Sequence, residues 1–231
     1  MRTQLFAVTC GVWRKDSLEW LGTQPIGSVV YVSFGSIVAL DEKQMEEIAW
    51  GLLNSGSRFL WVIKPSPMAK DNDKDNSVNG GSSVIPEKFL KEAEGEGKVV
   101  PWCPQDRVLA HPSVACFVTH CGWNSSWETL SSKVPVVVFP QWGDQVTDAK
   151  FLDEVYGMGV RLGRGELNTE SLSKEDVERC VFEVTQGLKS KEMKKNAMKL
   201  KKSAEEAVAE GGSSQRNLQA FINDILHIGL K

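Results

Sequence analysis

The chain of 231 residues is long enough to bury a sizeable core, as one large domain or two small ones. Its composition is typical of a globular protein, with 41% hydrophobic and 25% charged residues, and a formal net charge of −3 argues against a nucleic-acid partner. No apolar run approaches the roughly 20 residues that cross a bilayer, so we expect no membrane association. The apolar N-terminal segment is short and interrupted, which disfavours a signal peptide, and five cysteines without a Cys-x-x-Cys pair favour a reduced, cytoplasmic protein.

The first expected elements are a buried strand over 28–36 and an amphipathic helix over 41–56. Asp41, with Gln44 three residues further on, predicts the N-cap of this helix. Its apolar residues recur at helical spacing: Met45, Ile48, Ala49, Leu52 and Leu53.

The rest of the chain continues the alternation of strands and helices. Further strands are expected at 58–64, 98–103, 114–120, 134–140 and 157–163, and helices at 86–95, 124–133, 145–156 and from Lys174 almost to the end. Because the strands are continuously apolar, we predict an α/β fold, a doubly wound parallel (Rossmann-like) sheet with helices on both faces. Such sheets bind ligands at the carboxyl ends of their strands. Residues 64–86 are expected to form a long irregular loop, and residues 1–22 a linker rather than a core element.

A histidine and a cysteine stand side by side at the end of the strand expected over 114–120. Neighbouring strand residues point to opposite sides, so His120 and Cys121 are badly placed to act as a base and a nucleophile. A zinc site from Cys116 and His120 also fails, because these positions lie about 13 Å apart on a strand. We therefore expect no metal here and assign Cys116 to the core.

The turn after His120 has the features of an anion site. Gly122 lets the backbone approach a ligand, and Asn124 or Ser125 is a natural N-cap for the following helix. A strand, a tight turn and a helix N-terminus together supply free N–H groups and a positive dipole end. Considered alone, the same residues also fit an ordinary capped turn.

A second glycine-containing turn follows the first strand. The sequence "SFGS" (33–36) places Gly35 and Ser36 at its carboxyl end, so two such turns can bind one diphosphate. Neither a P-loop nor a dinucleotide fingerprint occurs. The aspartate-rich segment 71–75 resembles a metal-binding Asp-x-Asp motif, but a solvated charge run fits it better.

Other polar and aromatic residues at strand ends suit a nucleotide sugar. Trp102 follows a strand, where an aromatic ring can stack on a base, although a packing role fits as well. Glu128 can accept hydrogen bonds from ribose hydroxyls, and Asp144 with Gln145 can bind vicinal sugar hydroxyls.

Together, residues 102–145 closely resemble the signature of plant secondary-product glycosyltransferases that use UDP-sugars. The matching sequence is "WCPQDRVLAHPSVACFVTHCGWNSSWETLSSKVPVVVFPQWGDQ", without a gap, and the flanking segments are similar as well. The resemblance implies that the chain is the C-terminal, donor-binding half of a two-domain GT-B fold. Lys133 departs from the common pattern, because it replaces a glycine that often needs positive φ between helix and strand, and we expect strain or a shifted turn there.

The resemblance also implies the role of each site residue. Trp102 would stack on uracil, the Cys103 backbone and the Gln105 side chain would assist, and Glu128 would bind the ribose. The diphosphate would lie against Ser36, His120, Asn124 and Ser125, and the sugar against Trp123, Asp144 and Gln145. The final glutamine usually accompanies glucose as donor, so UDP-glucose is the expected donor substrate, with no cofactor.

The segment 140–166 further resembles the subgroup that glucosylates carboxylates to give glucose esters. The base that activates the acceptor belongs to the other domain in this family, and none of the three histidines, His111, His120 and His227, can be assigned to it. We therefore expect residues 1–22 to be an interdomain linker remnant, 23–189 the UDP-sugar-binding domain, and 190–231 helices that pack back toward an N-terminal domain. The chain alone is expected to bind the donor without turnover and to associate with itself through its exposed cleft face.

Two other functions are compatible with parts of the sequence. A non-catalytic nucleotide-sugar-binding module or regulator has the same donor site but no acceptor chemistry. An NAD-dependent dehydrogenase has a similar fold, but the absent Gly-x-Gly-x-x-Gly argues against it.

Overall fold

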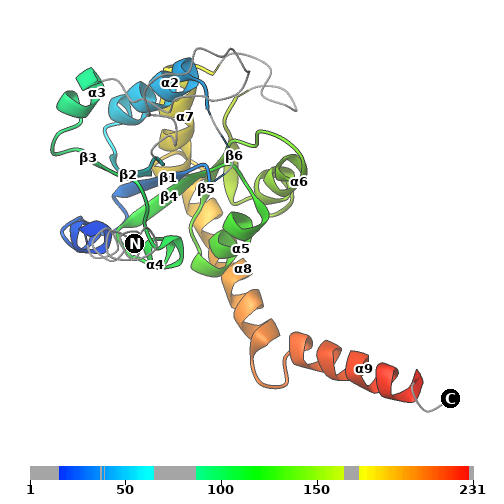
Figure 1. Ribbon diagram of the computed structural model, residues 1–231. Coiled ribbons are helices and arrows are strands. Elements are labelled where there is room, and N and C mark those ends of the chain that lie inside the picture. The colour runs from blue at the N-terminus through cyan, green and yellow to red at the C-terminus, as the bar shows by residue number, and fades with distance from the viewer. Residues whose placement is uncertain (1–15, 37, 39, 65–86, 164–171, 229–231) are drawn as a thin grey trace, which may run out of the picture.

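The computed structural model describes residues 16–36, 38, 40–64, 87–163 and 172–228, and shows one parallel sheet with helices on both faces (Figure 1). The strands run in the order β3-β2-β1-β4-β5-β6. Their bounds are β1 (Val29–Ser33), β2 (Arg58–Val62), β3 (Gly97–Val100), β4 (Val114–Thr119), β5 (Val136–Val138) and β6 (Gly159–Arg161). Every strand pair is parallel, and the order reverses between β1 and β4, as in a doubly wound fold. The predicted fold class is confirmed.

The helices alternate with the strands along the described chain. They are α2 (Glu42–Asn54), α3 (Glu87–Glu92), α4 (Gln105–Leu109), α5 (Trp123–Ser132), α6 (Asp144–Lys150), the π-helix η1 (Phe151–Val155), α7 (Lys174–Thr185), α8 (Ser190–Val208) and α9 (Ser213–Ile228). The single helix expected over 145–156 is thus divided, because its second half widens to π-type hydrogen bonding, and the strand expected over 98–103 ends at Val100.

One face of the sheet is covered by α2, α3 and α7. Val30 and Val32 of β1 point into this layer, together with apolar side chains of α2 and α7. The predicted capping box at the start of α2 is confirmed, because Asp41 accepts from the Gln44 N–H while the Gln44 side chain accepts from Asp41.

The opposite face is covered by α4, α5, α6, η1 and α8, and Tyr31 of β1 points into this layer. Residues 16–22, expected to lie outside the core, are helical and belong here, because the side chain of Leu21 is fully buried. Lys98 forms an ion pair with Asp16 at 2.5 Å, which also ties this helix to β3. The expected linker is therefore packed against the domain over its described part. Residues 1–15, and residues 65–86 of the loop expected over 64–86, lie outside the described residues.

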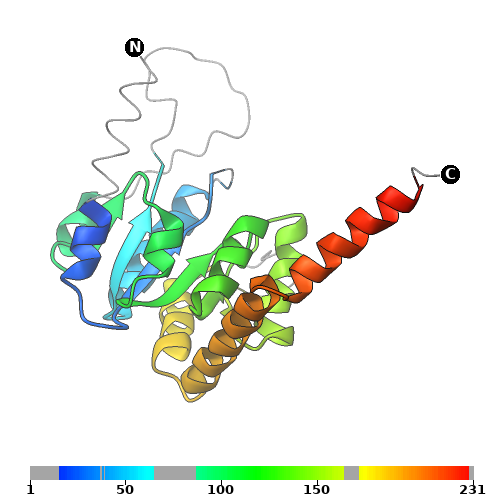
Figure 2. The same ribbon diagram turned by 90° about the horizontal axis from the view of Figure 1, so that it is seen from below.

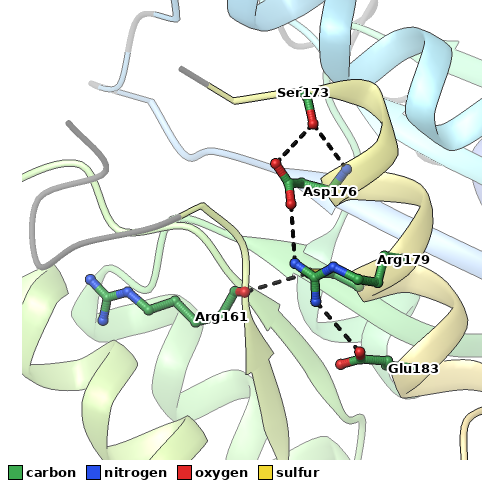
Figure 3. Close-up of polar contacts among 6 residues, drawn as sticks. Arg161, Ser173, Asp176, Arg179 and Glu183 are labelled. Carbon is green, nitrogen blue, oxygen red and sulfur yellow. Dashed lines mark hydrogen bonds and ion pairs between the residues drawn. The ribbon is translucent and has the colours of Figure 1, made fainter. Parts of the chain in front are cut away.

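Polar contacts run along the first turns of α7, and one further contact reaches the edge strand β6 (Figure 3). Ser173 caps α7 by accepting from the Asp176 N–H, and the Ser173 hydroxyl donates to the Asp176 carboxylate at 2.8 Å. Arg179 then bridges Asp176 and Glu183 along the helix, and the Cys180 thiol donates to the Arg161 carbonyl. The bond from Cys180 is the one among these that joins α7 to β6, the edge of the sheet.

The C-terminal helices differ in how they pack. The first half of α8 belongs to the domain, since Met193 and Ala197 are buried against it. Helix α9 instead packs mainly against the end of α8 and extends away from the sheet (Figure 2). Among the described helices, none combines the length and apolar character needed to cross a membrane.

Candidate functional site

The predicted site residues lie in the loops and helix starts at the carboxyl edge of the sheet. Ser36 follows β1, Trp102 follows β3, His120 follows β4 and Asp144 begins α6 after β5. Because the strands are parallel, these segments emerge on the same edge, on either side of the point where the strand order reverses.

His120 is held between two glycine turns. A Cβ atom on Gly35 would lie 2.7 Å from Cε1 of His120, and one on Gly122 would lie 2.5 Å from its Nε2. Gly35 also has a φ of +74°, a conformation that side-chain-bearing residues rarely adopt. The turns after β1 and β4 therefore meet at this imidazole, as the two-turn hypothesis requires.

The surroundings of His120 favour its neutral form. Burial lowers the pKa of His120, while the nearby Ser33 carbonyl and the Asp144 carboxylate act in the opposite direction. Its Nδ1 is buried without a hydrogen bond of good geometry to another described residue. A neutral imidazole at this position still carries one N–H that can donate to an anion.

The start of α5 differs from the prediction. Its N-cap is Gly122, with φ −62° and ψ 150°, so the expected N-cap at Asn124 or Ser125 is wrong. The helix begins at Trp123, and no side chain caps its first N–H groups. This leaves a helix N-terminus beside His120 whose backbone donors are available to a ligand.

Cys121, between them, is a core residue. It has a φ of +62° and its side chain is fully buried. Burial strongly raises the pKa of its thiol, and the Sγ atom lies 3.6 Å from the Thr119 carbonyl. These features agree with the rejection of Cys121 as a nucleophile, and Cys116 is likewise fully buried, as expected.

Four predicted residues meet in a hydrogen-bonded cluster between α4 and α5. The Gln105 Nε2 donates to Ser125 Oγ at 3.0 Å and to a Glu128 carboxylate oxygen at 2.6 Å. On its other side, Gln105 Oε1 accepts from the Tyr31 hydroxyl at 3.0 Å, and that hydroxyl lies 3.4 Å from the Cys103 thiol. The cluster links β1, α4, α5 and the segment after β3.

Tyr31 was not among the predicted site residues. Its signal in the sequence is a tyrosine within the aliphatic run "VVYVS", because a buried tyrosine hydroxyl normally requires a polar partner. Burial raises the pKa of Tyr31 well above its usual range, and burial also raises that of Cys103 to about 11. Both groups therefore keep their protons at neutral pH.

The remaining predicted residues lie nearby but are less tightly held. Trp102 is half-buried, and Ser36, Trp123, Asn124 and Asp144 are exposed. Gln145 is only 4% exposed, and its Oε1 accepts from the backbone N–H groups of Gln141 and Trp142. The structure therefore gives Gln145 a role in holding the loop after β5.

The chain is similar to known proteins over most of its length. Residues 15–206 match the family described as UDP-glucoronosyl and UDP-glucosyl transferase. The chain is 57% identical over 91% of its length to gallate 1-beta-glucosyltransferase of Punica granatum, and 53% identical over 91% to cinnamate beta-D-glucosyltransferase of Fragaria ananassa. These matches cover only 39% and 37% of the two relatives.

A solved structure has the same fold. The crystal structure of Os79 from O. sativa in complex with UDP matches with a TM-score of 0.78 and 39% identity, over 90% of this chain and 42% of that one.

Proposed function

Because the chain belongs to the family of UDP-glucoronosyl and UDP-glucosyl transferases, we propose that it forms the UDP-glucose-binding half of an inverting glucosyltransferase. The observation that carries the proposal is the pairing of two sites at one sheet edge. One is the cluster of Gln105, Ser125 and Glu128, and the other is His120 beside the uncapped start of α5.

The cluster suits a nucleoside. Glu128 uses one carboxylate oxygen for Gln105, which leaves the other to accept from the vicinal hydroxyls of a ribose. Trp102 is assigned to stacking on the uracil, with the Cys103 backbone at the edge of the base. The resemblance to the glycosyltransferase signature supports these roles.

The second site suits the diphosphate. The first N–H groups of α5, the His120 imidazole and the polar side chains of Ser36, Asn124 and Ser125 would surround its oxygens. Fixed donors of this kind stabilise the negative charge that grows on the departing UDP in the transition state. The glucose is assigned to Trp123, Asp144 and Gln145, with its C1 facing the cleft.

The acceptor is proposed to be a small carboxylic or phenolic acid. Two relatives more than 50% identical to this chain are named for gallate and cinnamate, both aromatic carboxylic acids. An oxygen of the acceptor carboxylate would attack C1 of the glucose as the bond to UDP breaks, giving an inverted glucose ester. This chemistry needs no metal ion or cofactor.

These residues alone are proposed to bind the donor without turning it over. The acceptor pocket, and the base that a hydroxyl acceptor would need, would come from an N-terminal domain, which the family places on the other side of the cleft. A test is to mix the chain with the N-terminal half of the Punica granatum relative and measure gallate glucosylation. We expect activity from the mixture and from neither half alone, and none from a mixture carrying Glu128→Ala.

The mixing experiment, together with titrations of this chain with UDP-glucose and with NAD, separates the alternative functions. A non-catalytic nucleotide-sugar-binding module would bind UDP-glucose but restore no glucosylation in the mixture. Saturable binding of NAD with none of UDP-glucose would instead contradict the proposal and favour a dehydrogenase.

A further inference from the structure

A directional chain of hydrogen bonds runs from the centre of β1 to the start of α5. A carboxylate only accepts hydrogen bonds, so the Gln105 atom that faces Glu128 at 2.6 Å must be the amide nitrogen. The amide oxygen then faces Tyr31, whose hydroxyl must donate its single proton to it. The Cys103 thiol, 3.4 Å from the same hydroxyl, is left to donate to the tyrosine oxygen.

The tyrosine at the start of this chain is rigidly placed. The Tyr31 side chain is 1% exposed, and its ring stacks on Phe117 of β4 with centroids 4.8 Å apart. Its backbone pairs with both neighbouring strands, β2 and β4. The hydroxyl is therefore a fixed point against which the Gln105 amide is oriented.

We propose that Tyr31 is a positioning residue for recognition of the ribose, acting through Gln105 on Glu128. The Tyr31 hydroxyl fixes the amide so that its nitrogen holds one Glu128 oxygen and leaves the other turned to the ligand. Without that hydroxyl the Gln105 amide oxygen loses its hydrogen bond in the cluster, and only the two bonds donated by the amide nitrogen hold the side chain. The Gln105 side chain is then free to shift, and the Glu128 carboxylate that it holds shifts with it. The inference rests on the proposed function, because it assumes that the ligand is a uridine nucleotide.

The test compares UDP with 2′-deoxy-UDP, which lacks one of the hydroxyls that Glu128 is proposed to bind. Tyr31→Phe keeps the ring and its stacking on Phe117 and removes only the hydroxyl. We expect this variant to bind UDP roughly five- to ten-fold more weakly, the effect of losing one hydrogen bond, and to lose less affinity for 2′-deoxy-UDP, which offers Glu128 one hydroxyl instead of two. The preference for UDP over 2′-deoxy-UDP should therefore narrow.

A purely structural role for Tyr31 gives a different result. If the role were purely structural, Tyr31→Phe would weaken the binding of UDP and of 2′-deoxy-UDP by the same factor. An unchanged preference for UDP over 2′-deoxy-UDP in folded Tyr31→Phe would therefore overturn the inference. Tyr156→Phe is the matched control, because Tyr156 is the other of the chain's two tyrosines, is half-buried beside Phe151 and has no contact with the cluster in the described contacts. It should bind both nucleotides as the unaltered protein does.

A second measurement covers the case in which Tyr31→Phe does not fold. In the unaltered protein with ¹⁵N-labelled glutamine, the Gln105 side-chain amide, identified by its loss in Gln105→Ala, should exchange its protons far more slowly than exposed glutamines. Exchange as fast as that of the exposed Gln219 would overturn the inference. If the folded, unaltered chain binds no UDP, the proposed function itself is refuted. If the unaltered chain binds UDP and Tyr31→Phe keeps the same preference for UDP over 2′-deoxy-UDP, only the role of Tyr31 is refuted.

Discussion

Lys133 ends α5 in a left-handed conformation, with φ 60° and ψ 28°. The sequence predicts strain here because lysine stands where related signatures have glycine, and the positive φ is confirmed. Holding a residue other than glycine in the left-handed conformation costs the folded state about 1–2 kcal/mol. A glycine avoids this cost, but it also gives the unfolded chain more conformational freedom, which offsets part of the gain in stability.

Replacing Lys133 by glycine should therefore stabilise the protein. We expect Lys133→Gly to raise the free energy of unfolding by about 0.5–1 kcal/mol, or the melting temperature by roughly 1–4 °C, in a thermal melt. The matched control is Lys199→Gly, an exposed lysine inside α8, which should lower the stability by about 1 kcal/mol. A loss of stability in both variants would contradict this account of the turn.

The protonation of His120 should change when the donor binds. Burial lowers its pKa in the free protein, and a diphosphate beside it would raise that pKa by favouring the charged form. Because the pKa is then higher in the complex than in the free protein, binding takes up protons, and affinity rises as the pH falls through the window between the two values.

Calorimetry in two buffers with different ionisation enthalpies measures this uptake directly. We expect proton uptake in the pH window between the two His120 pKa values, and its loss in His120→Asn. His227→Asn, which alters an exposed residue of α9, should keep it. Equal uptake by the His120 and His227 variants would remove His120 from the diphosphate site.

At the scale of the elements, the turns after β1 and β4 both pack against the His120 side chain, so a change in one turn should disturb the other. Gly35→Ala would introduce both strain at φ +74° and a Cβ atom against the imidazole. Gly56 has a similar φ of +63° but no atom within 4 Å of the added Cβ, so Gly56→Ala introduces the strain alone. We expect both variants to lose about 1–2 kcal/mol of stability, and only Gly35→Ala to weaken UDP binding by roughly ten-fold or more.

Thermal melts and UDP titrations of the two glycine variants give the comparison. Unimpaired UDP binding by Gly35→Ala would mean that the two turns do not form one anion site.

The elements were largely predictable because their signals are local. The apolar runs of β1, β4 and β5 are short and continuous, and Asp41 with Gln44 marks the start of α2, so their positions follow from neighbouring residues. The division of α6 from η1 has no such signal in the sequence. Over a single turn, the spacing of apolar residues in a π-helix is nearly the same as in an α-helix.

The candidate site was predictable only in part. Its place at the carboxyl edge follows from the parallel sheet, and the choice of residues from the resemblance to a known signature. The contact between Tyr31 and Gln105 joins residues 74 positions apart and depends on how α4 packs against β1, which no local pattern encodes. The N-cap at Gly122 was missed because serine and asparagine are the commoner caps.

At the scale of the whole molecule, α9 carries an uncovered apolar face. Its apolar side chains lie on one side of the helix and are 42–61% exposed: Leu218, Phe221, Ile222, Ile225 and Leu226. An N-terminal domain is proposed to cover this face in a complete enzyme. With this chain alone, we expect the faces of two copies to pair.

Analytical ultracentrifugation over a concentration series tests the pairing. Phe221→Glu should weaken the dimer roughly ten-fold or more, because it places a charge in the apolar face. Gln219→Glu adds the same charge on a polar residue of α9 and should leave the dimer intact. A chain that stays monomeric at all concentrations would remove the prediction.

The central claim, that these residues hold a complete donor site, is tested most directly by a calorimetric titration with UDP-glucose in the absence of added metal. The account predicts saturable binding to one site per chain, with Glu128→Ala abolishing or greatly weakening it. The claim would be contradicted if the chain binds no UDP-glucose although circular dichroism and thermal melting show that it is folded. The cluster around Gln105 and the turn at His120 would then require a partner domain before they bind a nucleotide sugar.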